Sequence, residues 1–152
     1  MISEEKMKFV ASKHGATIVG QDEFYDLNVN IYAPCALGAT LNDDTIARLH
    51  CEIVAGAANN QLANEEKHGQ LLLEKGIIYA PDFLINAGGL INCYSELEGY
   101  NRERAMDQAE HIYDTTMTVL SKSEDEGKPT YQIANQMAED RINKIAQIHR
   151  SL

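Results

Sequence analysis

The sequence predicts an α/β fold in which a mostly parallel sheet is covered by helices and followed by long C-terminal helices. Two patterns indicate it. Short β-branched segments alternate with helical segments, and from about residue 89 the apolar residues recur at three- and four-residue steps. Strands separated by helices run parallel, because each crossover returns the chain to the same edge of the sheet. Strands are expected at 29–33, 52–56 and 77–80, and helices at 4–14, 43–49 and 65–75.

Capping and breaking residues mark the ends of these elements. Favourable N-caps precede the helices, and Gly or Pro stands where a helix or strand should stop. The caps are Ser3, Asn42 and Asn64, and the stops are Gly15, Pro34, Gly76 and Pro81. A short apolar run at 16–19 and a polar helical turn at 21–27 lead into the first strand.

The remainder of the chain is predicted to be helical. One helical pattern extends from about residue 89 to 126, Gly127 to Pro129 interrupt it, and a last helix follows from 130 to about 150. We expect 1–126 to form one domain and 127–152 to pack on it. The charged residues of the last helix are expected to face solvent: Glu139, Asp140, Arg141 and Lys144.

Composition narrows the class of protein. A chain of 152 residues with 44% hydrophobic and 24% charged content is typical of one globular domain. The net charge of −10 argues against nucleic-acid binding, which needs a cationic surface. No apolar run is long enough for a membrane span, and Glu4 and Glu5 stand where a signal peptide would be apolar. The sequence therefore predicts a cytoplasmic protein.

The cysteines and histidines are not spaced as in a disulfide-linked or metal-binding protein. The three cysteines, Cys35, Cys51 and Cys93, are far apart and form no CxxC pair, and the five histidines are scattered. This spacing predicts reduced, mostly buried thiols and neither a disulfide nor a metal site.

Three turns of unusual composition follow the predicted strands. They are the first turn (33–39), the second turn (55–61) and the third turn (82–89). All contain Ala and Gly, and the second and third also contain Asn. Ligands of open α/β sheets bind at the carboxyl ends of the strands, where small residues let a flat cofactor approach and amides bond ribose or carboxamide groups. Any one turn is equally well explained by backbone geometry, and an Asn pair is more often an Asx-turn. Three together favour a binding site.

Longer strings within these segments resemble a known family. IYAPCALGATLND, IVAGAANNQL, the His68-Gly69 pair, GIIYAPDFLINAGGLIN and ELEGYNRERA are similar to the Glu/Leu/Phe/Val dehydrogenases, in order and over nearly the whole chain. The last string, 96–105, looks most like the leucine dehydrogenase branch. The resemblance implies the second half of a Rossmann-type, doubly wound sheet.

The resemblance also implies roles for individual residues. NAD would be the cofactor, with Ala33, Pro34, Cys35 and Ala36 beside its adenosine and ribose, Asn59 by the nicotinamide ribose and Asn86 at the nicotinamide end. The amino acid substrate would meet Asn60, Leu90 and Cys93. Cys93 replaces the aliphatic residue expected there, although a small thiol still packs against a branched side chain.

Other family features have no counterpart in this sequence. There is no GxGxxG loop for the pyrophosphate, and the acidic residue for the adenine ribose would fall at or before Met1. The catalytic lysine and aspartate belong to a substrate domain further upstream. We therefore expect an inactive fragment that lacks this domain, contains no catalytic residue and binds NAD barely or not at all. Without the middle strands of its sheet it should form a dimer or larger homo-oligomer.

The activity implied is the reversible, NAD-dependent oxidative deamination of L-leucine or another branched-chain amino acid to its 2-oxo acid. Phenylalanine, valine and glutamate dehydrogenases are alternatives within the family. A non-catalytic α/β assembly module is an alternative of another class, and the three turns argue against it. A stand-alone nucleotide-binding protein is disfavoured because no phosphate loop is present.

Overall fold

The computed structural model describes the backbone of residues 3–150 and the side chains of residues 3–148. In chain order the elements are α1 (Glu4–His14), the 3-10 helix η1 (Glu23–Asp26), β1 (Ile31–Tyr32), α2 (Asp43–Arg48), β2 (Ile53–Val54), α3 (Glu65–Glu74), β3 (Ile78–Tyr79), α4 (Asp82–Ile85), α5 (Gly88–Leu97), α6 (Arg102–Glu126) and α7 (Thr130–Arg150). The α/β class and the helices at both ends of the chain are confirmed.

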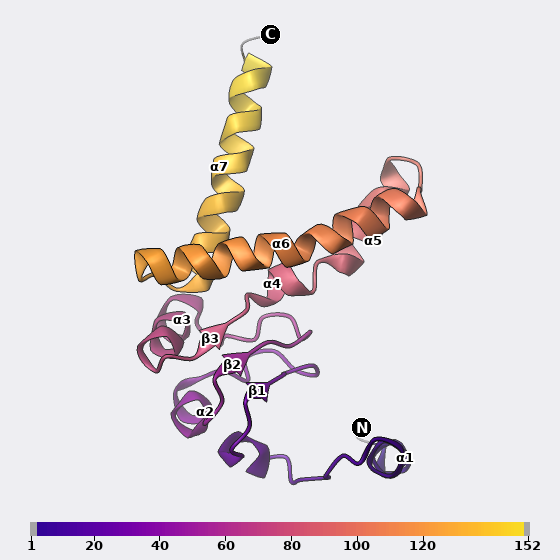
Figure 1. Cartoon of the computed structure of the whole chain (residues 1–152), viewed down its shortest axis with the longest axis vertical. Helices are drawn as coiled ribbons and strands as arrows, with labels where there is room; N and C mark the ends of the chain where they lie inside the picture. The colour runs from indigo at the N-terminus through magenta and orange to yellow at the C-terminus, as the bar shows by residue number, and fades with distance from the viewer. Residues whose placement is uncertain (1–2, 151–152) are drawn as a thin grey trace.

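The strands form one parallel sheet in the order β1-β2-β3. Each strand has only two residues, but backbone hydrogen bonds continue the ladder from Asn30 to Ala80. Both crossovers run in the same direction, and α2 and α3 therefore lie side by side on one face of the sheet (Figure 1).

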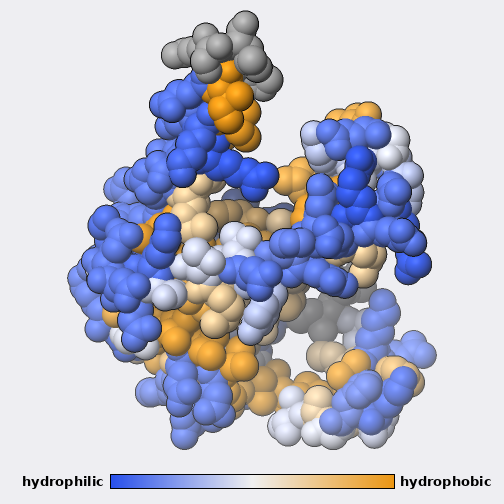
Figure 2. Space-filling model, turned by 45° about the horizontal axis from the view of Figure 1, so that its top comes forward, coloured by the Kyte–Doolittle hydropathy of each residue, from blue (hydrophilic) through white to orange (hydrophobic). Residues whose placement is uncertain are grey.

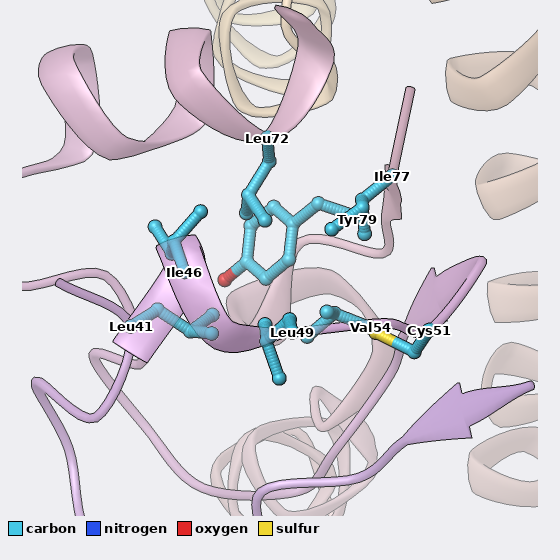
Figure 3. Close-up of a cluster of buried hydrophobic side chains, with 8 residues drawn as sticks. All are labelled: Leu41, Ile46, Leu49, Cys51, Val54, Leu72, Ile77 and Tyr79. Atoms are coloured by element: carbon cyan, nitrogen blue, oxygen red, sulfur yellow. The ribbon is translucent and has the colours of Figure 1, made fainter. Parts of the chain in front are cut away.

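The main core lies between this sheet and the two crossover helices. Leu41, Ile46, Val54 and Leu72 are fully buried there, and the ring of Tyr79 enters the same cluster (Figure 3). Each such side chain stabilises the fold by about 1.5–3 kcal/mol. This core fixes the sheet, and hence the place of the turns at its carboxyl edge.

A second, smaller core joins the C-terminal helices to the sheet. Val119 of α6 packs against Ile133 of α7, and Thr130 Oγ1 donates to the backbone oxygen of Tyr79 at 2.6 Å. Only the first turns of α7 are buried in this way, and the rest of the helix projects from the body (Figure 1). Apolar residues are visible on that projecting part in Figure 2.

Several expectations need correction. The helical stretch from 89 to 126 is two helices, because Gly99 adopts a φ of 78° and Asn101 caps a new helix. The third turn is largely helical, since it contains α4 and the start of α5. The expectation of mostly buried thiols is wrong. Cys51 is buried, whereas Cys35 in the first turn and Cys93 in α5 are exposed, and all three are free.

Two further properties of the helices concern the exposure of charge and membrane-spanning character. The charged residues of α7 are exposed, as predicted. Within residues 3–150, no helix combines the length and apolar character needed to traverse a bilayer.

Candidate functional site at the carboxyl edge of the sheet

The first and second turns are in direct contact. The backbone N–H of Ala58 donates to the oxygen of Pro34 at 3.0 Å, and that of Ala57 donates to Cys35 Sγ at 3.5 Å. A Cβ on Gly56 would lie 2.2 Å from the Pro34 oxygen, so only glycine allows this approach. Pro34 is itself buried and acts as a brace beneath the second turn.

Further hydrogen bonds join the ends of the same two turns. The backbone N–H of Ala39 donates to the oxygen of Asn60 at 2.7 Å, and that of Leu41 donates to the oxygen of Gln61 at 3.0 Å. Ala39 and Asn60 both adopt the left-handed conformation, with φ of 55° and 53°. A non-glycine residue stays in that region only where its surroundings hold it, and the paired backbones supply that restraint.

The third turn reaches the second through side-chain amides. Asn86 Nδ2 donates to Asn59 Oδ1 at 2.5 Å and to the backbone oxygen of Ala57 at 3.4 Å. The prediction that the three turns meet at one edge of the sheet is therefore correct. We call this assembly the turn cluster.

The exposed surface of the turn cluster is small and neutral. Ala33, Cys35, Ala36 and Asn59 are exposed, and Asn86 is half-buried. The cluster can therefore offer amide donors and acceptors at a surface that a planar ligand can approach closely.

The one carboxylate of the cluster is directed into the fold. Asp82 is buried and accepts a hydrogen bond from the Tyr79 hydroxyl at 2.8 Å. Burial first, and the Asp82 carboxylate second, raise the pKa of Tyr79 well above its usual range. This buried pair stabilises the start of α4 and offers no acid or base to a ligand at the surface.

The residues expected to meet the substrate lie beside the cluster. Asn60 is exposed at the tip of the second turn, and Leu90 and Cys93 are exposed one helical turn apart on α5, which begins two residues after Asn86. Leu90 retains 75% of its surface accessible. Leu90 and Cys93 form an open apolar wall, Asn60 is polar, and the three do not enclose a pocket among the described residues.

Sequence reasoning missed two residues that shape the cluster. Gln61 is completely buried under the second turn, where its amide bonds two backbone carbonyls, and Gly38 leaves room for the backbone oxygens of Asn59 and Asn60. A glutamine after two asparagines suggests a surface loop, so no local pattern indicates that its side chain turns inward.

The fold and the turn cluster together define a parallel α/β domain of the dehydrogenase type. The model of the glutamate/leucine/phenylalanine/valine dehydrogenase family matches residues 1–150, and the chain belongs to this family of NAD(P)-dependent amino-acid dehydrogenases. The resemblance noted in the sequence is thereby confirmed.

Individual relatives differ in the substrate that their names state. The chain is 53% identical over 144 residues to a leucine dehydrogenase of Thermoactinomyces intermedius, and 51% identical over 138 residues to an L-tryptophan dehydrogenase of Nostoc punctiforme. These alignments cover 95% and 91% of the chain, but only 39% of each relative. The chain thus spans about two-fifths of the length of the relatives it matches.

Solved structures agree with the fold. The crystal structure of the Nostoc punctiforme L-tryptophan dehydrogenase superposes with a TM-score of 0.89 at 49% identity, over 94% of this chain and 43% of that one. A hetero-hexameric glutamate dehydrogenase from Thermus thermophilus superposes with a TM-score of 0.68 over 95% of this chain and 37% of that one; at 19% identity it supports the fold alone.

Proposed function

We propose that this chain forms part of the NAD-binding domain of an amino-acid dehydrogenase that deaminates L-leucine or another branched-chain amino acid. The reaction is the reversible oxidation of the amino acid to its 2-oxo acid and ammonia. In this assignment residues 1–126 belong to a Rossmann-type domain, on which the helix within 127–152 packs. The amide contact between Asn59 and Asn86, made across two turns at the carboxyl edge, is the observation that carries the proposal.

The donor set of the turn cluster fits a dinucleotide. Ala33, Cys35 and Ala36 offer a flat, uncharged wall for adenosine, with Pro34 beneath it. The linked amides of Asn59 and Asn86 suit ribose hydroxyls and the carboxamide of nicotinamide. When bound, NAD supplies the hydride chemistry, and the protein orients it.

The substrate side of the proposal rests on α5. Leu90 and Cys93 are small or branched apolar groups on one exposed face of α5, and Asn60 is exposed at the second turn. A branched side chain can pack on that wall while its polar end faces Asn60. An aromatic amino acid is the second candidate, because the match to a tryptophan dehydrogenase is almost as close as the match to a leucine dehydrogenase.

Proton transfer must come from residues outside the turn cluster. Oxidative deamination needs an acid and a base within hydrogen-bond reach of the reacting nitrogen and oxygen. Asp82 is the only carboxylate in the three turns, and it is occupied by Tyr79. We therefore propose that a lysine and an aspartate elsewhere in the enzyme catalyse the reaction, and that the 152-residue chain alone has negligible activity.

A chimera tests this function. Residues 1–152 would replace the matched segment of the Thermoactinomyces intermedius leucine dehydrogenase, and NADH formation would be followed with leucine, tryptophan and phenylalanine. We expect activity that is highest with leucine, and about a tenfold higher KM for NAD in Asn86→Ala, since each tenfold corresponds to about 1.4 kcal/mol. Asn143→Ala, at an exposed position on α7, is the matched control. A folded chimera that oxidises none of the three amino acids refutes the assignment.

The same proposal includes self-association. β1 ends the sheet, its Ile31 is 56% exposed, and a cavity of about 800 Å³ lined by Tyr25, Tyr32 and the first turn lies next to it. The unpaired edge of β1 leaves backbone groups and apolar side chains that another copy of the chain can cover. We expect a dimer or larger assembly by light scattering, and a monomer at micromolar concentration would contradict it.

A further inference from the structure

The side chain of Gln61 lies inside the second turn. It has no accessible surface, and its Nε2 donates to the backbone oxygen of Gly56 at 2.6 Å and to that of Ala58 at 2.9 Å. One side-chain amide therefore connects the end of the second turn to the backbone of its earlier residues.

The surroundings fix which way this amide points. Two carbonyl oxygens face Nε2, so the reversed orientation would place Oε1 against both of them and lose both bonds. In the observed orientation Oε1 is buried with no hydrogen-bond partner among the described residues. Burying such an atom costs stability. Methionine has nearly the same shape and would avoid that cost, but it would leave the oxygens of Gly56 and Ala58 without this donor. The glutamine therefore joins the two parts of the turn while its own Oε1 stays without a partner among the described residues.

The two bonds act on the part of the turn that carries Asn59. Ala58 directly precedes Asn59 and Gly56 lies three residues before it, pressed against Pro34. Asn60, which follows, is held in the left-handed conformation. With both sides of Asn59 restrained, its backbone is held at a place from which Oδ1 receives Asn86 Nδ2.

We propose that Gln61 is a positioning residue for cofactor binding, which holds the second turn so that Asn59 and Asn86 meet at the site. The inference rests on the proposed function, because it assigns the turn cluster to NAD. Gln61 itself is too deeply buried to touch a ligand, and it acts through the turn.

Two variants separate positioning from simple stabilisation. Gln61→Met keeps the volume and removes both donors, and Gln61→Glu keeps the shape but sets a carboxylate against two carbonyl oxygens. Ser123→Ala is the matched control, because it also removes a buried hydrogen bond, from Ser123 Oγ to the oxygen of Lys128, far from the turn cluster.

The first measurement uses the full chain without cofactor. In ¹⁵N-edited NMR spectra the side-chain amide signals of Asn86 should shift in both Gln61 variants and stay in place in Ser123→Ala. The second measurement uses the chimera and NADH as the probe. The Kd for NADH should rise about tenfold in Gln61→Met and further in Gln61→Glu, with no added effect of Gln61→Met when Asn59 is already alanine.

The outcomes separate a failure of the proposed function from a failure of the positioning role alone. If the unaltered chimera is folded but does not bind NADH, the proposed function fails and this inference fails with it. If it binds NADH while Gln61→Met leaves both the Asn86 signals and the Kd unchanged, the positioning role alone is refuted. A rise in Kd equal to that of Ser123→Ala refutes it as well, because a loss of stability would then explain the effect.

Discussion

Replacing Gly56 with alanine tests how tightly the first and second turns are pressed together. The added Cβ would lie 2.2 Å from the oxygen of Pro34, 2.5 Å from its nitrogen and 2.6 Å from its Cδ. These atoms belong to a backbone and a proline ring, so no change of rotamer can move them away. The two turns would have to separate.

The size of the effect follows from that separation. Real Cβ contacts are not shorter than 3.0 Å, so the closest one must lengthen by at least 0.8 Å, the difference between 3.0 and 2.2 Å. Overpacking that moves a backbone costs about 1–3 kcal/mol. We take a loss of about 2 kcal/mol, the middle of this range. For a domain of this size each kcal/mol lowers Tm by about 2–4 °C, so Tm should fall by about 4–8 °C.

Urea unfolding followed by far-ultraviolet circular dichroism measures this loss. Gly89→Ala is the matched control, because a Cβ at Gly89 meets nothing within 4 Å and its φ is not positive. The control should be neutral or more stable by up to about 1 kcal/mol, since alanine has less backbone freedom to lose than glycine. If Gly56→Ala unfolds at the same urea concentration as the control, the turns are not in the contact described here.

Three further predictions concern the fold around the turn cluster. Tyr79→Phe should lower the free energy of unfolding in urea by about 1–3 kcal/mol, because the buried Asp82 loses its hydrogen-bond partner. A hydrogen bond from Arg48 lowers the pKa of Asp26 below its usual 3.8, so this pair should stabilise the fold above about pH 3.8 and lose its effect as pH falls through the lower, folded-state pKa. Urea unfolding between pH 2 and 6 should therefore show a weaker acid dependence in Arg48→Gln, and an unchanged slope would contradict the pairing. With a thiol reagent, two cysteines should react in the native protein and Cys51 only after unfolding; three fast thiols would contradict its burial.

The sequence is informative wherever one residue determines local geometry. Asn42 and Asn64 cap α2 and α3 as predicted, with their side-chain oxygens accepting from backbone N–H groups two or three residues on. Pro34 and Pro81 each lie two residues after the end of a strand, and the parallel order of the strands brings the turns that contain or follow them to one edge. The place of the candidate site was therefore predictable from motifs and connectivity.

Features that depend on distant contacts were not predictable. Whether Gln61 turns inward depends on two carbonyls that become available only when the second turn closes against Pro34. The periodic pattern from 89 to 126 continues across Gly99, and only the backbone conformation at that residue separates α5 from α6. The exposure of Cys93 likewise depends on which face of α5 the rest of the fold covers.

The proposed cofactor wall and the proposed substrate wall of this chain are built in different ways. The turn cluster is internally bonded, braced by Pro34 and neutral, so its geometry is set before any ligand arrives. The face of α5 that carries Leu90 is open, and its side chain contacts little within the described residues. A preformed wall suits a cofactor that relatives share, whereas an open wall takes its final shape from whatever packs against it. The chain is almost equally similar to a leucine and a tryptophan dehydrogenase, so overall identity does not select one substrate. Under the proposed function, the choice of amino acid would depend on a few side chains on α5 and on the surface opposite them.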